Sequence, residues 1–297
     1  MLESYFFIIN PNSGRKSDAG DLAEAVKTAF AGKAKAEIAF TVRPGHAQEI
    51  AREAAAKGFK AVVVAGGDGT LNETLPALCG TQVALGLVPK GSGNGLAREF
   101  DIPLNPRKAL EALLSFEPRR IDLGRINGEY YANVAGIGLD ALIGKAFNEF
   151  GKKGPRGKLP YYYFGVSRLL SYKPPEIELH CEGKVIRTKP LCIAFANCRQ
   201  FGGGAIIAPS ARPDDGLLNI VVAEHKPLYE TARYLHKLFT GTIDKVPFVT
   251  TIKSASVFVR AEGEIIYQLD GEPRSAQREI RVDIVPAALS ILAPKKI

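Results

Sequence analysis

The sequence predicts an N-terminal α/β domain with a parallel sheet and a C-terminal domain that is a mostly antiparallel β-sandwich. Strand and helix patterns alternate over roughly the first 125 residues, as a parallel α/β sheet requires. After Leu123 the apolar residues take a period of two, for example over 177–181. A chain of 297 residues that is 46% hydrophobic and 24% charged has enough apolar material for both cores.

The first domain is expected to contain buried strands that alternate with helices. The strand at 5–10 is a short apolar run, and the helix at 18–31 has small and apolar residues such as Leu22 and Val26 on one face. The strands at 60–65 and 83–88 are almost continuously apolar, which is typical of strands covered on both faces. The other expected elements are a strand at 36–41 and helices at 47–57, from the glycine turn to about 78, and at 106–116, where Pro106 occupies a favoured first-turn position.

The second half is expected to form antiparallel strands joined by turns rich in Gly, Pro and Asp. Strands are predicted at 177–181, 191–196, 217–222, 256–259, 265–269 and 280–284, with one clear helix at about 227–239. The pattern at 289–292 is compatible with a strand or with a segment that packs back on the first domain. We therefore predict domains at 1–124 and 125–286, and the pattern leaves open whether 287–297 packs back on the first.

Charge and cysteine usage narrow the classes of protein. A formal net charge of +8 is compatible with an anionic substrate, an anionic membrane surface or nucleic acid, but no motif supports nucleic-acid binding. Four cysteines without a C-x-x-C pair indicate reduced thiols, so we expect a cytoplasmic protein. The sequence has neither a signal-peptide pattern nor an apolar stretch near the roughly 20 residues that cross a bilayer. Any membrane contact is therefore expected to be peripheral.

Three polar loops that contain glycine follow strands of the first domain, at 10–16, 66–70 and 90–94. In an open α/β sheet, ligands bind at the carboxyl ends of the strands. Glycine allows backbone N–H groups to approach a ligand closely, and the N-terminus of a following helix adds partial positive charge. One such loop would be equally compatible with an ordinary tight turn. Three in one half of the chain favour a phosphate site.

Residues within these loops narrow the kind of phosphate site. The sequence has no G-x-x-x-x-G-K-[ST], which excludes a P-loop, and residues 91–96 are one residue short of the dinucleotide fingerprint. Asp68 lies in a Gly-Gly-Asp-Gly turn and would repel phosphates unless Mg²⁺ or a bound water lies between them. Because Mg²⁺ commonly bridges carboxylates and phosphates at nucleotide sites, the pattern predicts a nucleotide site with Mg²⁺.

Three motifs occur in an order that resembles that of a known protein family. Asn-Pro-Asn-Ser-Gly at 10–14, Gly-Gly-Asp-Gly-Thr-Leu-Asn-Glu at 66–73 and Pro-Lys-Gly-Ser-Gly-Asn at 89–94 together resemble the diacylglycerol kinase catalytic-domain family, which includes bacterial lipid kinases, sphingosine kinases and ceramide kinases. The resemblance extends over nearly the whole chain and implies an N-terminal domain like that of NAD kinase or phosphofructokinase. Residues 208–217 look like the family's structural Mg²⁺ segment, and Asp-Gly-Glu at 270–272 looks like the segment with the catalytic base.

The resemblance implies roles for the matching residues. Asp68 would order Mg²⁺ and the phosphates, and Glu272 would accept the proton of the lipid hydroxyl. Asp215, with the backbone carbonyls of Arg212 and Leu217, resembles a second Mg²⁺ site away from the chemistry. The alternatives are a solvated hairpin residue for Glu272 and an Asp-Asp-Gly turn without an ion for Asp215. The positions that resemble ATP contacts are Asn10, Ser13, Thr41, Gly66, Gly67, Asp68, Gly69, Thr70, Leu71, Asn72 and Ser92.

Three residues depart from the family pattern. Ser92 stands where Thr is frequent, and its hydroxyl preserves the chemistry. Lys90 is charged where an apolar or small residue is common, so it either adds a phosphate contact or is exposed. Gly95 stands where an acidic or small residue is frequent, and substrate choice could differ there.

The resemblance implies a lipid kinase that uses ATP and Mg²⁺ and transfers the γ-phosphoryl group to a hydroxyl of diacylglycerol or a related lipid, such as a sphingoid base. The rival hypotheses are a kinase of a soluble acceptor such as NAD and a non-catalytic sensor that binds ATP. The Asp-Gly-Glu segment favours a lipid acceptor. The presence of Asp68, Asp215 and Glu272 together argues against a sensor. No pattern indicates the oligomeric state.

The segment from Lys145 to Lys173 suggests how a lipid substrate would be reached. Helically spaced apolar residues over 139–150 precede it, and four aromatic residues occupy 161–164. Basic charge beside apolar anchors suits a peripheral membrane face. The alternative is a core helix followed by a solvated loop, and the pattern leaves both open. The basic residues are Lys145, Lys152, Lys153, Arg156, Lys158, Arg168 and Lys173, against the single acid Glu149.

Overall fold

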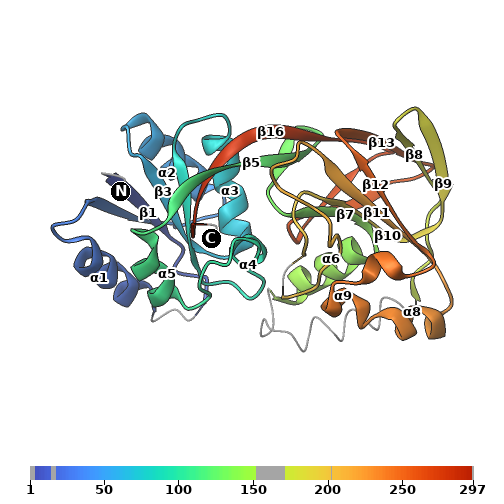
Figure 1. Cartoon of the computed structure of the whole chain (residues 1–297), viewed down its shortest axis with the longest axis horizontal. Coiled ribbons are helices and arrows are strands. Elements are labelled where there is room, and N and C mark those ends of the chain that lie inside the picture. Colours follow the sequence, from blue (N-terminus) through green and yellow to red (C-terminus); the bar gives the residue numbers. More distant parts are fainter. Residues whose placement is uncertain (1–3, 15–17, 152–170, 202, 296–297) are drawn as a thin grey trace. The chain divides into compact units, whose positions relative to one another are not determined.

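The computed structural model describes residues 4–14, 18–151, 171–201 and 203–295 (Figure 1). The chain divides into two compact units, of which unit 1 comprises Met1–Asp122 with Pro286–Ile297 and unit 2 comprises Leu123–Val285. The elements that lie within unit 1 are β1 (Ser4–Ile9), α1 (Asp18–Phe30), β2 (Lys35–Phe40), α2 (His46–Ala56), β3 (Ala61–Gly66), α3 (Asp68–Leu78), β4 (Ala84–Pro89), α4 (Gly95–Glu99) and α5 (Pro106–Leu113).

The remaining elements begin with β5, in which unit 1 passes into unit 2, and end with β16, which returns to unit 1. They are β5 (Glu117–Ile126), β6 (Glu129–Tyr131), β7 (Val134–Gly138), α6 (Leu139–Gly151), β8 (Ile177–Cys181), β9 (Lys184–Thr188), β10 (Pro190–Ala196), β11 (Leu218–Glu224), α8 (Leu228–Tyr234), α9 (Lys237–Thr240), the 3₁₀ helix η1 (Ile243–Lys245), β12 (Val249–Ser254), β13 (Ser256–Ala261), β14 (Ile265–Leu269), β15 (Glu272–Ala276) and β16 (Glu279–Ala293).

Unit 1 contains a parallel sheet in the strand order β2-β1-β3-β4. Every residue of β3 and β4 is buried, as expected for strands covered on both faces. The register pairs Ile9 with Phe40 and with Ala65, and it pairs Gly66 with Pro89. The carboxyl ends of the four strands therefore lie at one edge of the sheet. The predicted α/β class is confirmed.

The helices of unit 1 bury apolar stripes against this sheet. Val26 and Phe30 of α1 and Leu110 of α5 belong to one core cluster with strand residues such as Phe7 and Val63. Helix α5 begins where the proline indicated, and the Asn105 side chain accepts the backbone N–H groups of residues 107 and 108 as its N-terminal cap. The five-residue helix α4 was not predicted, because one turn is too short to show a helical period.

Unit 2 is a β-sandwich, which confirms the second predicted class. One sheet has the order β12-β11-β10-β7-β14-β15, and the other contains β16-β13-β8-β9 with β5 and β6. The inward residues of both sheets form one core cluster: Phe195 and Ile220 come from the first sheet, and Leu179, Val259 and Val282 come from the second. Alternation of these residues with polar ones produced the period-two pattern in the sequence.

Strand β16 changes its pattern of burial along its length. Its first part alternates exposed and buried residues and pairs antiparallel with β13, whereas Ala288 to Ala293 are all buried and Ser290 pairs in parallel with Ala84 of β4. The change occurs at Ala287, which has a φ of 48° and donates its N–H to Asp122 Oδ1 at 2.7 Å. The segment 289–292 is therefore a strand of unit 1.

Two predictions for unit 2 need comment. The single helix expected over 227–239 is interrupted, because α8 ends at Tyr234 and α9 begins at Lys237. In α6, Leu139 and Ala146 are buried, while Leu142 and Ile143 are half-buried. The side chains of Phe147 and Phe150 and the basic residues over 152–170 lie outside the described residues, so the choice between a membrane face and a core helix stays open.

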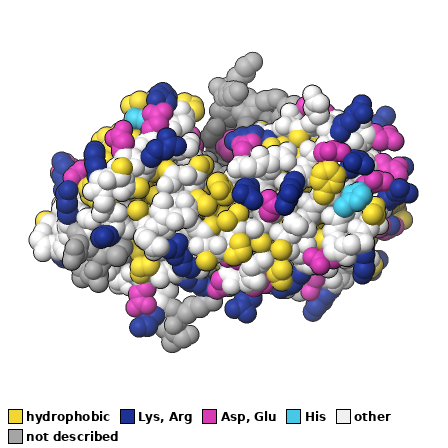
Figure 2. Space-filling view, turned by 90° about the horizontal axis from the view of Figure 1, so that it is seen from above, with side chains coloured by type: hydrophobic (Ala, Val, Ile, Leu, Met, Phe, Trp, Pro, Cys, Tyr) yellow, Lys and Arg dark blue, Asp and Glu magenta, His cyan; other side chains and the backbone are white. Residues whose placement is uncertain are grey.

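The surface carries both signs of charge. Figure 2 shows Lys and Arg side chains interspersed with Asp and Glu over the face in view. Many are paired, as Arg43 is with Glu49 at 2.6 Å and Arg260 with Glu279 at 2.8 Å. Exposed pairs of this kind contribute little to stability, because water and salt screen both charges. None of the helices in the described ranges is long and apolar enough to span a bilayer.

Candidate functional site

The predicted loops begin at the shared edge of the unit 1 sheet. Asn10, Thr41 and Lys90 directly follow β1, β2 and β4. Each extends the hydrogen bonding of the strands by one residue: Asn10 N donates to Ala65 O at 3.0 Å, Thr41 N to Ile9 O at 3.0 Å and Lys90 N to Gly66 O at 2.8 Å. The structure therefore brings together the N-terminal site residues that the sequence placed in separate loops.

A hydrogen bond ties the first loop to helix α3. Asn10 Nδ2 donates to Thr70 Oγ1 at 2.8 Å, and Asn10 Oδ1 accepts the N–H of Asn12 at 2.9 Å. Gly66 must lack a side chain here, because a Cβ would lie 2.8 Å from Thr70 Cβ. Ser13 is half-buried and its N–H donates to Asn10 O. The loop that precedes α1 is thus held to the helix that follows β3.

Asp68, the first residue of α3, holds the third loop against the second. Its Oδ2 accepts the N–H of Asn94 at 2.8 Å, and its Oδ1 accepts the N–H of Gly95 at 2.9 Å. Burial raises the pKa of this carboxyl, and the two N–H donors oppose that rise. The sequence predicted an aspartate beside phosphates. The structure adds that its carboxylate clamps residues 94 and 95 to the N-terminus of α3.

The glycines of these two loops are needed where the loops touch. A Cβ on Gly91 would lie 2.7 Å from Gly67 Cα, and a Cβ on Gly93 would lie 2.7 Å from Asp68 Oδ2. Asn94 adopts a left-handed conformation with a φ of 50°, and its side chain bonds both backbone groups of Gly91. Packing between the loops thus accounts for Gly91 and Gly93 in the absence of any ligand, which is a requirement that the sequence analysis did not anticipate.

The other predicted ATP positions differ in exposure. Gly67, Gly69 and Asn72 are half-buried, Leu71 is buried in the core, and Ser92 is exposed. A small cavity of about 20 Å³ lies between β3, β4 and this clamp. Its lining includes Gly66, Gly67, Asp68, Leu71 and Asn94.

Glu272 lies in a tight hairpin of unit 2. It is the first residue of β15 and pairs with Leu269, the last residue of β14, so the loop contains only Asp270 and Gly271. Their φ values are 47° and 90°, as a two-residue type I′ turn requires. Asp-Gly is a strong signal for this turn, so the hairpin is a local consequence of the sequence. Glu272 is half-buried.

Asp270 anchors this hairpin, a role that the sequence analysis missed. Its carboxylate accepts three backbone N–H groups, those of Ala132 at 2.9 Å, Asn133 at 3.0 Å and Val134 at 2.8 Å. These donors precede and begin β7. The turn that contains Asp270 and precedes Glu272 is therefore held to a neighbouring segment by the Asp270 carboxylate. The feature of the sequence that could have indicated this anchoring role is an acidic residue directly before Gly271 and Glu272.

The predicted second metal site is a turn whose carboxylate already has partners. Asp215 Oδ1 accepts the N–H of Leu217 at 3.1 Å, and its Oδ2 pairs with Lys253 Nζ at 3.1 Å. The side chain of Arg212 points to Asp214, with 3.6 Å between Nε and Oδ1. Within the described residues there is no group of three or more His, Cys, Asp or Glu side chains that could hold a metal ion.

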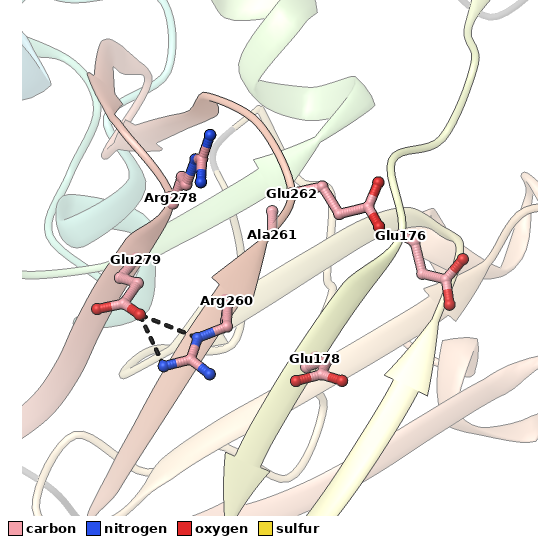
Figure 3. Close-up of a pocket in the computed structure, with 7 residues that line it drawn as sticks. All are labelled: Glu176, Glu178, Arg260, Ala261, Glu262, Arg278 and Glu279. Carbon is pink, nitrogen blue, oxygen red and sulfur yellow. Dashed lines mark hydrogen bonds and ion pairs between the residues drawn. The ribbon is translucent and has the colours of Figure 1, made fainter.

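A larger depression lies elsewhere on unit 2, on the solvent face of β8, β13 and β16. It has a volume of about 410 Å³ and contains no predicted site residue. Figure 3 shows the Arg260 guanidinium directed at Glu279, with Glu176 and Glu262 on the other side. Glu178, which also lines it, pairs with Arg187. The lining is an open surface with charges of both signs, so the candidate sites remain the loops of unit 1 and, separately, the Glu272 hairpin of unit 2.

Comparison with known proteins identifies the family of this chain. Residues 4–126 match the family model of the diacylglycerol kinase catalytic domain, and residues 132–293 match the YegS C-terminal NAD kinase beta sandwich-like domain. A diacylglycerol kinase of Mycobacterium tuberculosis (strain CDC 1551 / Oshkosh) is 34% identical over 259 residues, covering 84% of this chain and 82% of the relative. A diacylglycerol kinase of Bacillus subtilis (strain 168) is 29% identical over 269 residues, covering 89% and 88%.

The fold is also found among solved structures. A crystal structure of a protein from Bacillus anthracis str. Sterne superposes with a TM-score of 0.81 at 22% identity, covering 98% of this chain and 97% of that one. The family models and the relative from Mycobacterium tuberculosis confirm the predicted family resemblance. The chain belongs to the diacylglycerol kinase catalytic-domain family, with a YegS-type C-terminal domain, and is a diacylglycerol kinase-like lipid kinase.

Proposed function

We propose that this lipid kinase transfers the γ-phosphoryl group of ATP to a hydroxyl of diacylglycerol or a related lipid, with Mg²⁺ as the metal. The family implies ATP use. The observation that carries the proposal is the Asp68 clamp, which fixes two glycine loops at the carboxyl edge of a parallel sheet and next to the N-terminus of α3. Backbone N–H groups and a helix N-terminus at such an edge suit a polyphosphate.

Phosphoryl transfer depends mainly on positioning and on neutralisation of charge. The lipid hydroxyl oxygen forms a bond to the γ-phosphorus while the bond to the bridging β,γ-oxygen breaks, which leaves ADP. Glu272 takes the hydroxyl proton on its carboxylate. In this proposal Asn10, Thr41, Thr70 and Ser92 contact the nucleotide.

The residues around Asp68 fit a magnesium ion held through water. Both carboxylate oxygens of Asp68 accept one N–H each, and each retains acceptor capacity for a water molecule. Mg²⁺ retains several waters at nucleotide sites, so contact through water is sufficient. When bound, the ion would neutralise phosphate charge.

The acceptor lipid is identified by direct assay. Purified protein is incubated with γ-labelled ATP, Mg²⁺ and mixed micelles that each contain diacylglycerol, a sphingoid base, ceramide or phosphatidylglycerol, with NAD as a soluble acceptor. We expect label on one lipid. Label on NAD alone would contradict the proposed acceptor class, and no label on any acceptor would contradict the proposed reaction.

We propose that Asp215 binds a second, structural Mg²⁺ in competition with Lys253. Since a ligand specific for the folded state stabilises it, Mg²⁺ at 100 times its Kd should raise the free energy of unfolding by about 2.7 kcal/mol. Asp215→Asn should abolish this rise, and Lys253→Met should increase it by releasing Oδ2. Thermal unfolding with and without Mg²⁺ measures the effect, with the exposed Asp244→Asn as control. An equal rise in Asp215→Asn would show that the ion binds elsewhere.

We propose that the basic segment over 145–173 contacts anionic membranes. Each basic residue near such a surface contributes about 1 kcal/mol, so replacing Lys152, Lys153, Arg156 and Lys158 by Gln should weaken vesicle binding by more than about tenfold. Cosedimentation with phosphatidylserine-containing vesicles at two salt concentrations tests this. The control replaces four exposed lysines of unit 1: Lys27, Lys33, Lys57 and Lys60. Equal loss in both variants would indicate a nonspecific effect of net charge.

A further inference from the structure

A chain of two side-chain hydrogen bonds leads from helix α6 to the hairpin that carries Glu272. Gln268 Nε2 donates to Asp140 Oδ2 at 3.2 Å, and Gln268 Oε1 accepts the backbone N–H of Gly271 at 2.6 Å. Gln268 lies in β14 and is only 3% exposed. Asp140 lies in the first turn of α6, and its Oδ1 is buried without a hydrogen-bond partner among the described residues. Gln268 thus connects a carboxyl group to the turn directly before Glu272.

The two residues of the turn are held by different groups. The Asp270 carboxylate bonds to the backbone at 132–134, and the Gly271 N–H bonds to Gln268. In a type I′ turn both residues have a positive φ, and the next residue continues the strand. The orientation of the backbone at Gly271 therefore sets the direction in which Glu272 leaves the turn. Asp270 fixes the position of the turn, while Gln268 fixes the peptide plane between Asp270 and Gly271 in the middle of the turn.

Two glycines make room for this arrangement. Gly136 is paired with Gln268 across β7 and β14, and a Cβ on it would overlap Asp140 Oδ2. Gly144, further along α6, approaches the hairpin itself, since a Cβ there would lie 3.4 Å from Gly271 O. Both small residues allow α6 to lie close to the turn, which is a second observation that links α6 to Glu272.

We propose that Asp140 and Gln268 form a relay that positions Glu272 for proton transfer. Asp140 orients the Gln268 amide by accepting its N–H, so that the amide oxygen faces Gly271. Asp140 is a positioning residue in this inference, which rests on the proposed role of Glu272. Gln268 suits this position because its side-chain amide donates one hydrogen bond, to Asp140, and accepts another, from the Gly271 N–H.

The charge of this cluster depends on the titration of Asp140. Burial raises the pKa of Asp140 to about 6. Among the described residues, the titratable groups whose pKa responds to Asp140 are the Tyr172 hydroxyl and the Cys192 thiol, and both pKa values are raised chiefly by burial. These two groups therefore stay neutral, and Asp140 is the member of this cluster that changes charge near neutral pH.

The relay is tested by exchanging the hydrogen-bond donor and acceptor between residues 140 and 268. Gln268→Glu retains an acceptor for Gly271 N–H but places two carboxyl groups face to face. We expect kcat at pH 8 to fall by about 10- to 100-fold, with the KM for ATP changed by less than about twofold. Adding Asp140→Asn supplies an amide that donates to the carboxylate introduced at position 268, so the double variant should recover to within about threefold of the wild type. Gln277→Glu makes the same charge change at an exposed position and serves as control.

A second measurement does not depend on catalysis. Hydrogen exchange at the Gly271 amide should be accelerated in Gln268→Ala relative to the wild type, because the amide loses its acceptor. The inference is overturned if the double variant is no more active than Gln268→Glu, or if exchange at Gly271 is unchanged in Gln268→Ala. If Glu272→Gln retains full activity, the proposed catalytic base is wrong, and exchange at Gly271 still decides whether the relay exists.

Discussion

Replacing Glu272 by Gln should reduce turnover by about 100- to 10 000-fold while ATP affinity changes by less than about twofold. A positioned general base contributes this range of acceleration, and glutamine has the shape of glutamate but cannot accept the hydroxyl proton. The residue lies in unit 2, at the start of β15, whereas the proposed nucleotide loops belong to unit 1. The loss should therefore appear in kcat, measured at saturating ATP and lipid, and not in a nucleotide-binding titration.

The hairpin offers a matched control for this variant. Glu129 is an exposed glutamate of unit 2 that pairs with Arg274 of β15 at 3.0 Å. Glu129→Gln removes one carboxylate near the same strand without touching the turn, and its turnover should stay within about twofold of the wild type. Full activity in Glu272→Gln would assign Glu272 to the alternative predicted from the sequence, a solvated hairpin residue.

Replacing Asp68 by Asn should disrupt the clamp between the two glycine loops and lower kcat/KM for ATP by about 100-fold. The carboxylate uses one oxygen for each of two N–H donors. An asparagine offers one oxygen and one NH₂ group, so one backbone donor would face another donor. A buried N–H left without an acceptor costs about 1–3 kcal/mol, and displacement of reacting groups by about 1 Å can reduce rates by 100-fold.

The Mg²⁺ dependence of the activity shows whether Asp68 also holds the metal ion or acts only as the clamp between the loops. In Asp68→Asn we expect the activity to require more Mg²⁺ as well as more ATP, because the same carboxylate is proposed to hold the ion through water. Asp21→Asn changes an exposed aspartate of α1 and controls for net charge. An unchanged Mg²⁺ titration in Asp68→Asn would remove the metal from the role of Asp68 and leave the clamp alone.

Residues that act on their immediate neighbours in the sequence made much of the fold predictable. The candidate site depends on contacts between residues far apart in the sequence, which such patterns do not indicate. Asp-Gly at 270–271 and Pro106 each act on their immediate neighbours, so the hairpin and the start of α5 follow from the sequence. The clamp joins Asp68 to residues 26 and 27 positions away. Asp270 bonds to groups more than 130 positions away. A pattern in the sequence cannot indicate which distant N–H a carboxylate will accept.

The glycines also show that a sequence pattern does not identify the distant group that a residue contacts. Glycines in the second and third loops indicated that the backbone lies close to another group there. The sequence suggested a ligand, whereas at Gly91 the structure places the backbone of Gly67 at that position. Both interpretations follow from the missing side chain, and only the packed structure tells which neighbour requires it.

Strand β16 has a consequence for the order of folding. The parallel sheet of unit 1 receives the second neighbour of β4, on the edge that β3 leaves open, only from Ser290 and Ile291 of β16, after all of unit 2 in the chain. This pairing closes a loop of about 200 residues, and such non-local contacts form slowly. During synthesis unit 1 therefore leaves the ribosome with this edge of β4 unpaired while unit 2 is still being made. An unpaired apolar strand edge favours aggregation, so we expect the nascent chain to depend on chaperones until β16 has docked.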